Sequence, residues 1–224
     1  MARFVSDYSK ETKGATPDGR FNSPAFHNNH QPILEVVRPH LEDTPGHVLE
    51  IGSGPGQHVA VFGAAFPAQT FWPSDPLYAH RKSVAAWCAH HNVSNVRAPV
   101  ELDAADEDWR LGARGRPPAE NLRAILCTNV FHIAPWEVAQ GVLRGAGKHL
   151  AGDGALFVYG PFSRDGTHTA PSNADFDASL RASNSHWGVR DTADISSEAA
   201  LHGLVMDRIV EMPSNNFVLV LKQG

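Results

Sequence analysis

Short apolar runs alternate with amphipathic stretches along most of the chain. The apolar runs cover residues 47–51, 70–74, 95–102, 122–129 and 155–160, and their length and polar boundaries predict buried strands. Helical periodicity predicts helices over residues 31–41, 57–66, 77–91 and 135–150, the first with Pro32 at its first position. Strands that alternate with helices through short connections predict a mostly parallel sheet with helices on both faces.

The last third of the chain departs from this alternation. A long polar connection over residues 160–176 leads to helices predicted near 175–182 and 193–202, the latter with Thr192 as candidate N-cap. Two strand-like runs then follow, separated only by the sequence PSN. Because so short a connection joins antiparallel neighbours, we expect the sheet to end in a hairpin.

Composition sets the broad class of the protein. A chain of 224 residues with 42% hydrophobic residues is long enough for one sizeable core, and we expect an N-terminal arm over residues 1–28 before a domain over 29–224. The net charge of -5 and the absence of a basic stripe argue against a nucleic-acid partner.

The chain also lacks the sequence signals of a secreted or membrane protein. Its first residues contain no apolar leader segment, and no run reaches the ~20 apolar residues that span a bilayer. Cys88 and Cys127 both lie in apolar patterns, which favours buried thiols in a reducing compartment over a disulfide. We therefore expect a cytoplasmic protein with no membrane partner.

Candidate chemistry begins in the sequence LEIGSGPGQH, residues 49–58. Glycine stands at positions 52, 54 and 56, directly after the first predicted strand. A dinucleotide fingerprint needs its third glycine at position 57, where Gln57 stands, and no Gly-Lys-Ser/Thr follows as in a phosphate-binding loop. The remaining pattern, an acidic residue before alternate glycines, is typical of class I methyltransferases that use S-adenosylmethionine (SAM).

The chemistry of SAM is compatible with these residues. Glycine lets backbone approach the ligand closely, and Glu50 can balance its cationic end. Asp75 follows the second strand, where a carboxylate accepts from ribose hydroxyls, and Asp103 follows the third, placed to accept from the adenine amino group. Two simpler readings remain open, in which Asp75 forms a turn and Asp103 begins a helix. The complete set of predicted SAM contacts is Glu50, Gly52, Ser53, Gly54, Gly56, Gln57, His58, Asp75, Asp103, Ala104 and Asn129.

Beyond this motif, the chain resembles an uncharacterised family known as domain of unknown function 938, which includes the animal methyltransferase-like protein 26. The resemblance runs from about residue 20 to 221 and is carried by WPSDP, HIAPWE, GAGKHLAGDG, YGPFSRDGTHTAPSNADFDASLR, WGVRD and EMPSNNF. It implies a Rossmann-like three-layer α/β sandwich of the class I methyltransferase type, with a seven-stranded, mostly parallel sheet and an antiparallel last strand. It implies no substrate. The sequence FHNNHQPI departs from the charged stretch expected there, which puts any role of Asn29 in doubt.

Two residues at strand ends are candidates for catalysis. His132 follows the fourth strand, and the ordinary pKa of histidine suits a general base. Tyr159 closes the fifth strand and is placed to orient a substrate. The alternatives are that His132 holds a loop and that Tyr159 only packs.

The connection over residues 160–176 is the candidate substrate wall, because loops at this end of a sheet carry specificity. With the two catalytic candidates, its side chains complete the predicted substrate contacts: His132, Tyr159, Phe162, His168, Asn173 and Phe176. A packed surface loop with no such role is the alternative.

Several other chemistries lack their sequence signals. The histidine pairs His27/His30 and His90/His91 have no accompanying Cys pair or H-E-x-x-H, so we expect no metal. No G-x-S-x-G elbow occurs, and residues 129–132 lack the Pro-Pro motif of enzymes that methylate base amino groups.

These observations favour a SAM-dependent methyltransferase that acts on O, N or S of a small molecule. The first alternative is a SAM-binding interaction or regulatory protein of the same fold without methyl transfer. A nicotinamide-dependent oxidoreductase is a second, against which the position of Gln57 counts. The oligomeric state stays open.

Overall fold

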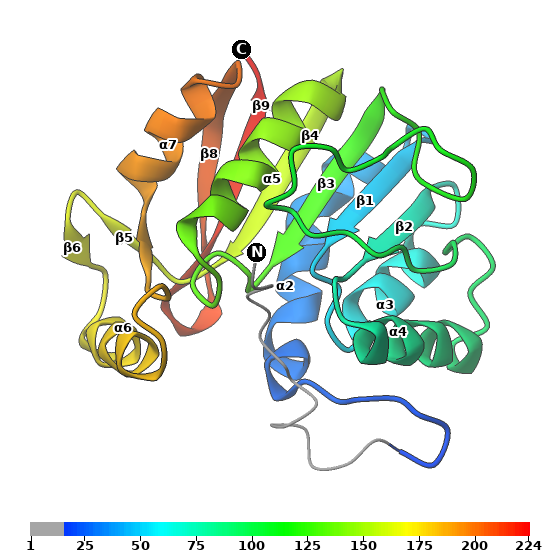
Figure 1. Cartoon of the computed structure of the whole chain (residues 1–224), viewed down its shortest axis with the longest axis horizontal. Coiled ribbons are helices and arrows are strands. Elements are labelled where there is room, and N and C mark those ends of the chain that lie inside the picture. Colours follow the sequence, from blue (N-terminus) through cyan, green and yellow to red (C-terminus); the bar gives the residue numbers. More distant parts are fainter. Residues whose placement is uncertain (1–15) are drawn as a thin grey trace.

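A six-stranded mixed sheet forms the centre of the molecule (Figure 1). The computed structural model describes residues 16–224. The sheet order is β2-β1-β3-β4-β9-β8; the first four strands are parallel, and β9 lies antiparallel between β4 and β8, so the predicted hairpin is confirmed. The strands are β1 (His47–Ile51), β2 (Thr70–Ser74), β3 (Leu122–Thr128), β4 (Leu150–Gly160), β8 (Leu204–Met212) and β9 (Asn216–Gln223), with the 3-10 turn η1 (Pro213–Asn215) inside the hairpin.

The predicted strand over residues 95–102 is not a regular strand, so seven strands are not confirmed. This segment runs beside the outer edge of β2 and makes only two isolated bridges to it, Phe71 with Val96 and Ser74 with Val100. The apolar pattern predicted a strand here, and the segment does lie beside the sheet. A continuous hydrogen-bond ladder, however, does not form.

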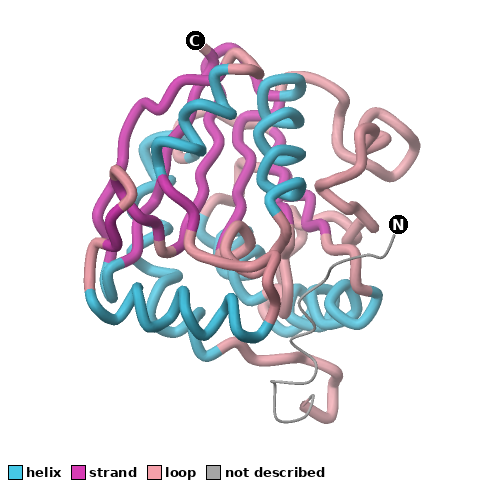
Figure 2. The backbone as a smooth tube through the Cα atoms, turned by 60° about the vertical axis from the view of Figure 1, so that its left-hand side comes forward, coloured by secondary structure: helices cyan, strands magenta, loops and turns pink. Residues whose placement is uncertain are grey.

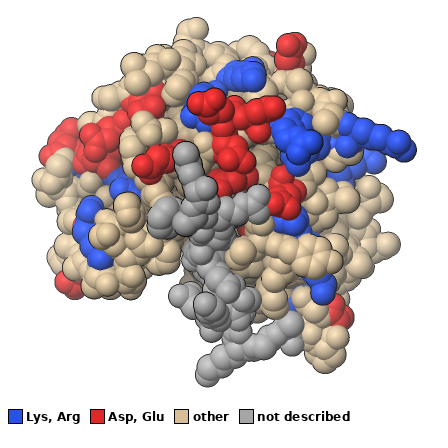
Figure 3. Space-filling model, viewed as in Figure 1, with Lys and Arg blue, Asp and Glu red and all other residues tan. Residues whose placement is uncertain are grey.

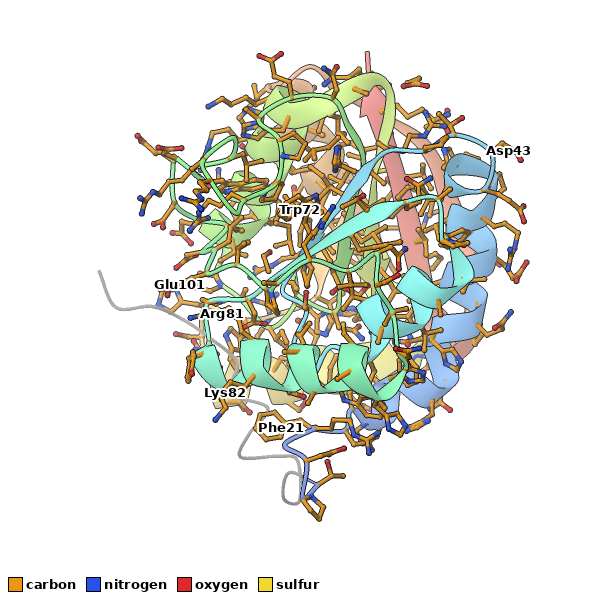
Figure 4. All side chains as sticks on the ribbon, turned by 90° about the vertical axis from the view of Figure 1, so that its right-hand side faces the viewer. Phe21, Asp43, Trp72, Arg81, Lys82 and Glu101 are labelled. Atoms are coloured by element: carbon orange, nitrogen blue, oxygen red, sulfur yellow. The ribbon has the colours of Figure 1, made fainter. Side chains whose placement is uncertain are left out.

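Two prolines explain the interrupted ladder. Pro73 in β2 and Pro99 in the edge segment both lack a backbone N–H, and each therefore removes a donor that a regular ladder requires. A side-chain contact also holds the segment, because Arg81 donates to Glu101 over 3.1 Å. Figure 4 shows these two residues close together at one end of α4 (Tyr78–His90).

Helices cover both faces of the sheet (Figure 2). On one face, α2 (Pro24–Leu41), α3 (Gln57–Ala65) and α4 pack over a core that includes Ala124 and Leu126 of β3. On the other, α5 (Trp136–His149) and α7 (Thr192–Ala200) pack over Ile125 and Cys127 of the same strand. Because the middle of β3 buries both sets of alternate side chains, residues 124–127 are continuously apolar. The predicted three-layer arrangement is therefore present.

Helix α2 begins at Pro24, seven residues before the predicted start at Gln31. Pro24 takes the first helical position, where a missing N–H costs nothing, and Pro32 lies inside the helix. A buried face that runs from Phe26 to Leu41 continues past Pro32, so packing outweighs the lost hydrogen bond. The first fifteen residues of the predicted N-terminal arm lie outside the described residues.

The connection after β4 folds into a small second sheet that the sequence did not predict. It consists of β5 (Phe162–Arg164), β6 (Thr167–His168) and β7 (Arg190–Asp191), with α6 (Pro171–Ser183) between β6 and β7. The N-cap of α7 is Asp191 rather than the predicted Thr192, since the Ala193 N–H donates to Asp191 Oδ1 over 2.8 Å.

Two predictions on the character of the chain can be compared directly with the structure. Cys88 and Cys127 are both free, as expected. Across residues 16–224, no helix has the length and apolar character needed to traverse a bilayer.

Candidate functional site

The backbone of the loop between β1 and α3 lies close to Val130 at one end and to Val84 of α4 at the other, and the middle of the loop faces open space. Gly52 and Gly56 have φ of 66° and 92°, and a Cβ would lie 2.7 Å from Val130 Cγ2 at the first and 2.5 Å from Val84 Cα at the second. Gly54, with φ of 53°, has no atom within 4 Å of its Cβ position. The outer two glycines are therefore needed for packing, and the middle one faces open space.

That open space belongs to a cavity at the carboxyl ends of the parallel strands, which we call the glycine-loop cavity. It lies where β1 is flanked by β2 on one side and β3 on the other, the topological switch point at which open α/β sheets bind ligands. Its walls come from residues 50–58, 75–76, 102–104, 128–130 and 133–134 together with Ser23, Ala25, His80 and Val138.

Glu50 is a buried carboxyl group with an unsatisfied oxygen in this wall. It is 3% exposed, and its Oε2 atom has no hydrogen-bond partner among the described residues. Burial raises the pKa of Glu50 to about 8; the charge of Asp75 adds to this rise, and a hydrogen bond from Ser53 opposes it. A buried carboxyl with one oxygen left over suits a cationic ligand group.

Asp75 follows β2 and organises the glycine loop from the other side. Its Oδ2 accepts the Gly54 N–H over 2.9 Å, and its Oδ1 accepts the Leu77 N–H over 2.8 Å. The His80 ring contacts the same Oδ1 through Nδ1 at 3.1 Å. Asp75 thus forms a turn, one of the two readings left open by the sequence, and lines the cavity as well.

The chain before α2 closes the cavity through Gln57. The Ser23 N–H donates to Gln57 Oε1 over 2.6 Å, and Gln57 Nε2 donates to Asn22 Oδ1 over 3.0 Å. One residue earlier, the Phe21 N–H donates to Ser83 on α4, and Figure 4 shows Phe21 beneath this helix. These long-range contacts bring Ser23 and Ala25 into the wall, which the sequence did not predict.

A second, larger cavity of about 700 Å³ adjoins the first, and we call it the amide cavity. Its walls come from the start of α2, from α6 and from the 213–216 turn, which lie below the strand ends in Figure 1. Three residues line both cavities: Ala25, Asn129 and Ile133. Ligands in the two cavities would therefore meet beside these residues.

His132 and Tyr159 both line the amide cavity. Burial, with a smaller contribution from the charge of Arg190, lowers the pKa of His132 to about 4, so its imidazole is neutral at neutral pH. Phe176 on α6 packs edge-on against this ring, with centroids 5.6 Å apart. Burial also raises the pKa of Tyr159, which keeps its hydroxyl protonated.

Asn29 links the two cavities. Its Oδ1 lies 2.8 Å from His58 Nε2 beside the glycine loop, and its side chain also hydrogen-bonds Tyr159. Asn29 is 3% exposed, so both bonds are shielded from water. The sequence left any role of Asn29 in doubt; in the structure, Asn29 connects His58 with Tyr159.

The family model described as "Protein of unknown function (DUF938)" matches residues 20–223. The chain belongs to the DUF938 family. The resemblance stated from the sequence is thus confirmed at the level of this family.

The DUF938 chain is also similar to solved structures of methyltransferases. An O-methyltransferase family protein from Burkholderia thailandensis superposes with a TM-score of 0.71 at 18% identity, over 87% of this chain and 56% of that one. Human N-acetylserotonin methyltransferase in complex with SAM gives 0.68 at 10%, over 89% and 53%. A methyltransferase of calicheamicin biosynthesis in its SAH-bound form gives 0.63 at 17%, over 87% and 54%. The chain spans about half the length of these structures, and the likeness shows a methyltransferase-like α/β fold.

The glycine-loop cavity of the DUF938 protein fits a SAM molecule. All of the residues predicted to contact SAM line it, including Asp103 and Ala104 from one further loop and Asn129 from another. The unpartnered Glu50 Oε2 suits the cationic part of such a ligand, and the open side of Gly54 gives it backbone to lie against. Within the described residues, no group bonds to Glu50 Oε2 and no atom fills the space beside Gly54.

The predicted substrate contacts divide between three places. Asn173 and Phe176 line the amide cavity together with His132 and Tyr159. Phe162 is 1% exposed in the core beneath α5 and α7 and lines neither cavity, because β5 turns its side chain inward. His168 lies across α6 in a separate open cavity, the charged cavity, where its Nε2 is 3.5 Å from Asp177 Oδ2. The structure therefore separates Phe162 and His168 from the other four.

Asn215 and Asn216 lie at the turn between the last two strands, where Asn216 Nδ2 donates to the Pro213 carbonyl. Both residues also line the amide cavity. Among residues 16–224, no group of three His, Cys, Asp or Glu side chains is arranged to hold a metal ion.

Proposed function

We propose that this protein is a SAM-dependent methyltransferase that transfers a methyl group to O, N or S of a small molecule. One observation carries the proposal: a buried carboxyl with an unpartnered oxygen, Glu50, stands beside an open glycine loop at the switch point of a methyltransferase-like sheet. A nicotinamide cofactor is less well supported, because Gln57 occupies the position of the third glycine and is engaged with the chain before α2.

When bound, SAM supplies an activated methyl group on a sulfonium. Glu50 balances the positive charge of the ligand, Asp75 accepts from the ribose hydroxyls, and Asp103 accepts from the adenine amino group. Asp75 is already oriented by its bonds to the Gly54 and Leu77 amides, so little side-chain freedom is lost on binding. These residues position the ligand and take no part in proton transfer.

The amide cavity is the proposed site of the methyl acceptor, because it meets the glycine-loop cavity at Ala25, Asn129 and Ile133. Holding donor and acceptor in line can contribute up to about 7–11 kcal/mol to the rate. His132 is neutral and accepts the proton that an acceptor hydroxyl, amine or thiol loses. Tyr159 orients the acceptor.

Two further parts of the proposal concern partners and location. Acidic and basic side chains lie side by side on the face seen in Figure 3, which supports a small-molecule acceptor over a phosphate backbone. The two free thiols support a cytoplasmic location. A relationship to methyltransferase-like protein 26 is supported by the family membership alone.

Two measurements test the function. Calorimetry with SAM and with NAD should show binding of SAM only, and release of S-adenosylhomocysteine should be detected with a suitable acceptor fraction from cell extracts. SAM binding without transfer to any fraction would favour the interaction or regulatory protein.

His132→Ala tests the proposed base. This variant should lower turnover about 10²-fold or more and leave SAM affinity nearly unchanged, since His132 lines only the amide cavity. Loss of SAM affinity in this variant would refute its role as base.

A further inference from the structure

The amide cavity contains no formally charged side chain. None of its lining residues is Asp, Glu, Lys or Arg, as far as residues 16–224 are concerned. Serines 172, 179, 183 and 214 contribute hydroxyl groups. Side-chain amides supply most of the remaining polar groups, from Asn28, Asn29, Asn129, Asn173, Asn215 and Asn216.

The titratable groups in the lining are also neutral at neutral pH. The pKa of His132 falls to about 4, chiefly through burial, and burial raises the pKa of Tyr159. A charged ligand would therefore give up part of its hydration without gaining an opposite charge, which lowers its affinity relative to a neutral ligand.

The guanidinium of Arg190, whose charge acts on His132, is bonded to backbone carbonyls outside the amide cavity. Arg190 donates from Nε to the Phe131 carbonyl over 3.1 Å and from Nη2 to the Ala134 carbonyl over 2.7 Å. It lines the charged cavity on the other side of the His132 loop, together with Asp177 and Asp194. Arg190 thus fixes the loop that carries His132 and adds no charged group to the amide cavity.

The Tyr159 hydroxyl adds a hydrogen-bond donor to the lining of the amide cavity. Burial raises its pKa, so the hydroxyl keeps its proton at neutral pH. Asn29, which lines the same cavity, already accepts at Oδ1 from His58 Nε2 over 2.8 Å. A ligand in the cavity can therefore accept the Tyr159 proton.

Ring faces complete the lining. Phe176 and His132 stand edge to face, and Trp187 lies at the same cavity. Aromatic side chains of this kind favour a planar ring in the ligand.

We infer that the methyl acceptor is an uncharged aromatic compound that bears a hydrogen-bond acceptor, such as an amide carbonyl, for the Tyr159 hydroxyl. This inference rests on the proposed function, since it assigns the acceptor to the amide cavity.

Three probes with one ring system test the inference. They are 3,4-dihydroxybenzamide (neutral), 3,4-dihydroxybenzoate (anionic) and 3,4-dihydroxybenzylamine (cationic), each titrated by calorimetry into protein saturated with S-adenosylhomocysteine. The amide should bind about ten-fold more tightly than either charged probe. Equal binding of a charged probe, or no binding of the amide at millimolar concentration, would overturn the inference. Failure of S-adenosylhomocysteine to bind would instead count against the proposed function.

Paired substitutions at Asn28 locate the probe. Asn28 lies exposed on the first turns of α2 and lines the amide cavity, so a charge there should not disturb folding. Asn28→Asp should improve binding of the benzylamine relative to the benzamide by about two- to five-fold, and Asn28→Arg should do the same for the benzoate. Affinity for S-adenosylhomocysteine should be unchanged in both. If neither variant alters the preference, the probe does not occupy the amide cavity and the inference fails.

Discussion

The two adjoining cavities differ in how they treat charge. The glycine-loop cavity has three acidic residues in its wall, Glu50, Asp75 and Asp103, the first two of them at most 4% exposed. The amide cavity has amides, hydroxyls and neutral rings. Under the proposed function this division matches the chemistry. SAM, the methyl donor, is positively charged and lies beside the acidic residues, whereas the methyl acceptor is uncharged and lies beside the neutral groups.

The two cavities also differ in what their ligand affinity depends on. An ionised Glu50 is disfavoured until a cation arrives, so part of the binding energy of the ligand depends on the state of one carboxyl group. The amide cavity has no comparable group, and its selectivity depends on hydrogen-bond geometry instead. Substitutions can test the two cavities separately.

The largest effect is expected from Gly56→Ala in the glycine loop. The new Cβ would lie 2.5 Å from the Val84 Cα atom at a φ of 92°, so strain and overpacking should lower the free energy of unfolding by about 2 kcal/mol or more and abolish SAM binding. Gly54→Ala is the matched control. Its Cβ meets no protein atom, so it should cost at most about 1–2 kcal/mol in stability and still weaken SAM binding, because the methyl group enters the cavity. Urea unfolding and calorimetry measure both, and wild-type affinity in Gly54→Ala would contradict the assignment.

Asp75→Asn should follow in size. SAM affinity should fall by about 1–3 kcal/mol, the range for hydrogen bonds that involve a charged group. Asp103→Asn serves as the comparison. Among the hydrogen bonds described for its side chain, Asp103 accepts only the Ala105 N–H, so this variant should lose less SAM affinity than Asp75→Asn. Calorimetry with SAM decides the order, and an unchanged affinity in Asp75→Asn would remove this residue from the ribose.

Glu50→Gln should remove a pH dependence. The folded-state pKa of about 8 exceeds the ordinary value of 4.5, so the ligand-free folded protein binds the proton more tightly than the unfolded chain. The free energy of unfolding should therefore fall as the pH rises from about 5 to about 8, and SAM affinity should rise over the same window as the carboxylate forms. Urea unfolding at pH 5, 6.5 and 8 should show this fall in the wild type and not in Glu50→Gln. Parallel pH profiles would show that Glu50 is ionised throughout.

The smallest effect is expected from His168→Ala. This residue lies in the charged cavity beside Asp177, outside both cavities of the proposed site. Turnover and SAM affinity should stay within about two-fold of the wild type, and the free energy of unfolding within about 0.5 kcal/mol. Loss of activity would return His168 to the substrate contacts predicted from the sequence.

The glycine-loop cavity was largely predictable because its residues are local in sequence. Glu50, Gly52, Gly54 and Gly56 follow one another through a strand, a turn and a helix start, and Asp75 ends the next strand. Parallel strand ends meet at one edge of the sheet, so spacing along the chain translates directly into proximity.

The amide cavity was less predictable because its walls come from distant segments. Ala25 and Asn29 on α2 reach it through contacts with residues some thirty to one hundred and thirty positions away, which no local pattern encodes. Phe162 was assigned to the substrate because it lies in the connection after a strand end, but its side chain packs into the core. The edge segment over residues 95–102 was also predicted incompletely. Its hydropathy pattern indicates burial, but this pattern does not show that Pro73 and Pro99 lack the N–H groups that a regular ladder needs.

The attachment of the chain at residues 21–23 to Gln57 and α4 has a consequence for the extent of the working unit. A chain that began at residue 29 would keep every strand of the sheet, but it would lose the first five residues of α2, with the buried Phe26 among them. It would also lose Ser23 and Ala25 from the wall of the glycine-loop cavity. The segment before residue 29 therefore contributes to the cavity as well as to the helical layer.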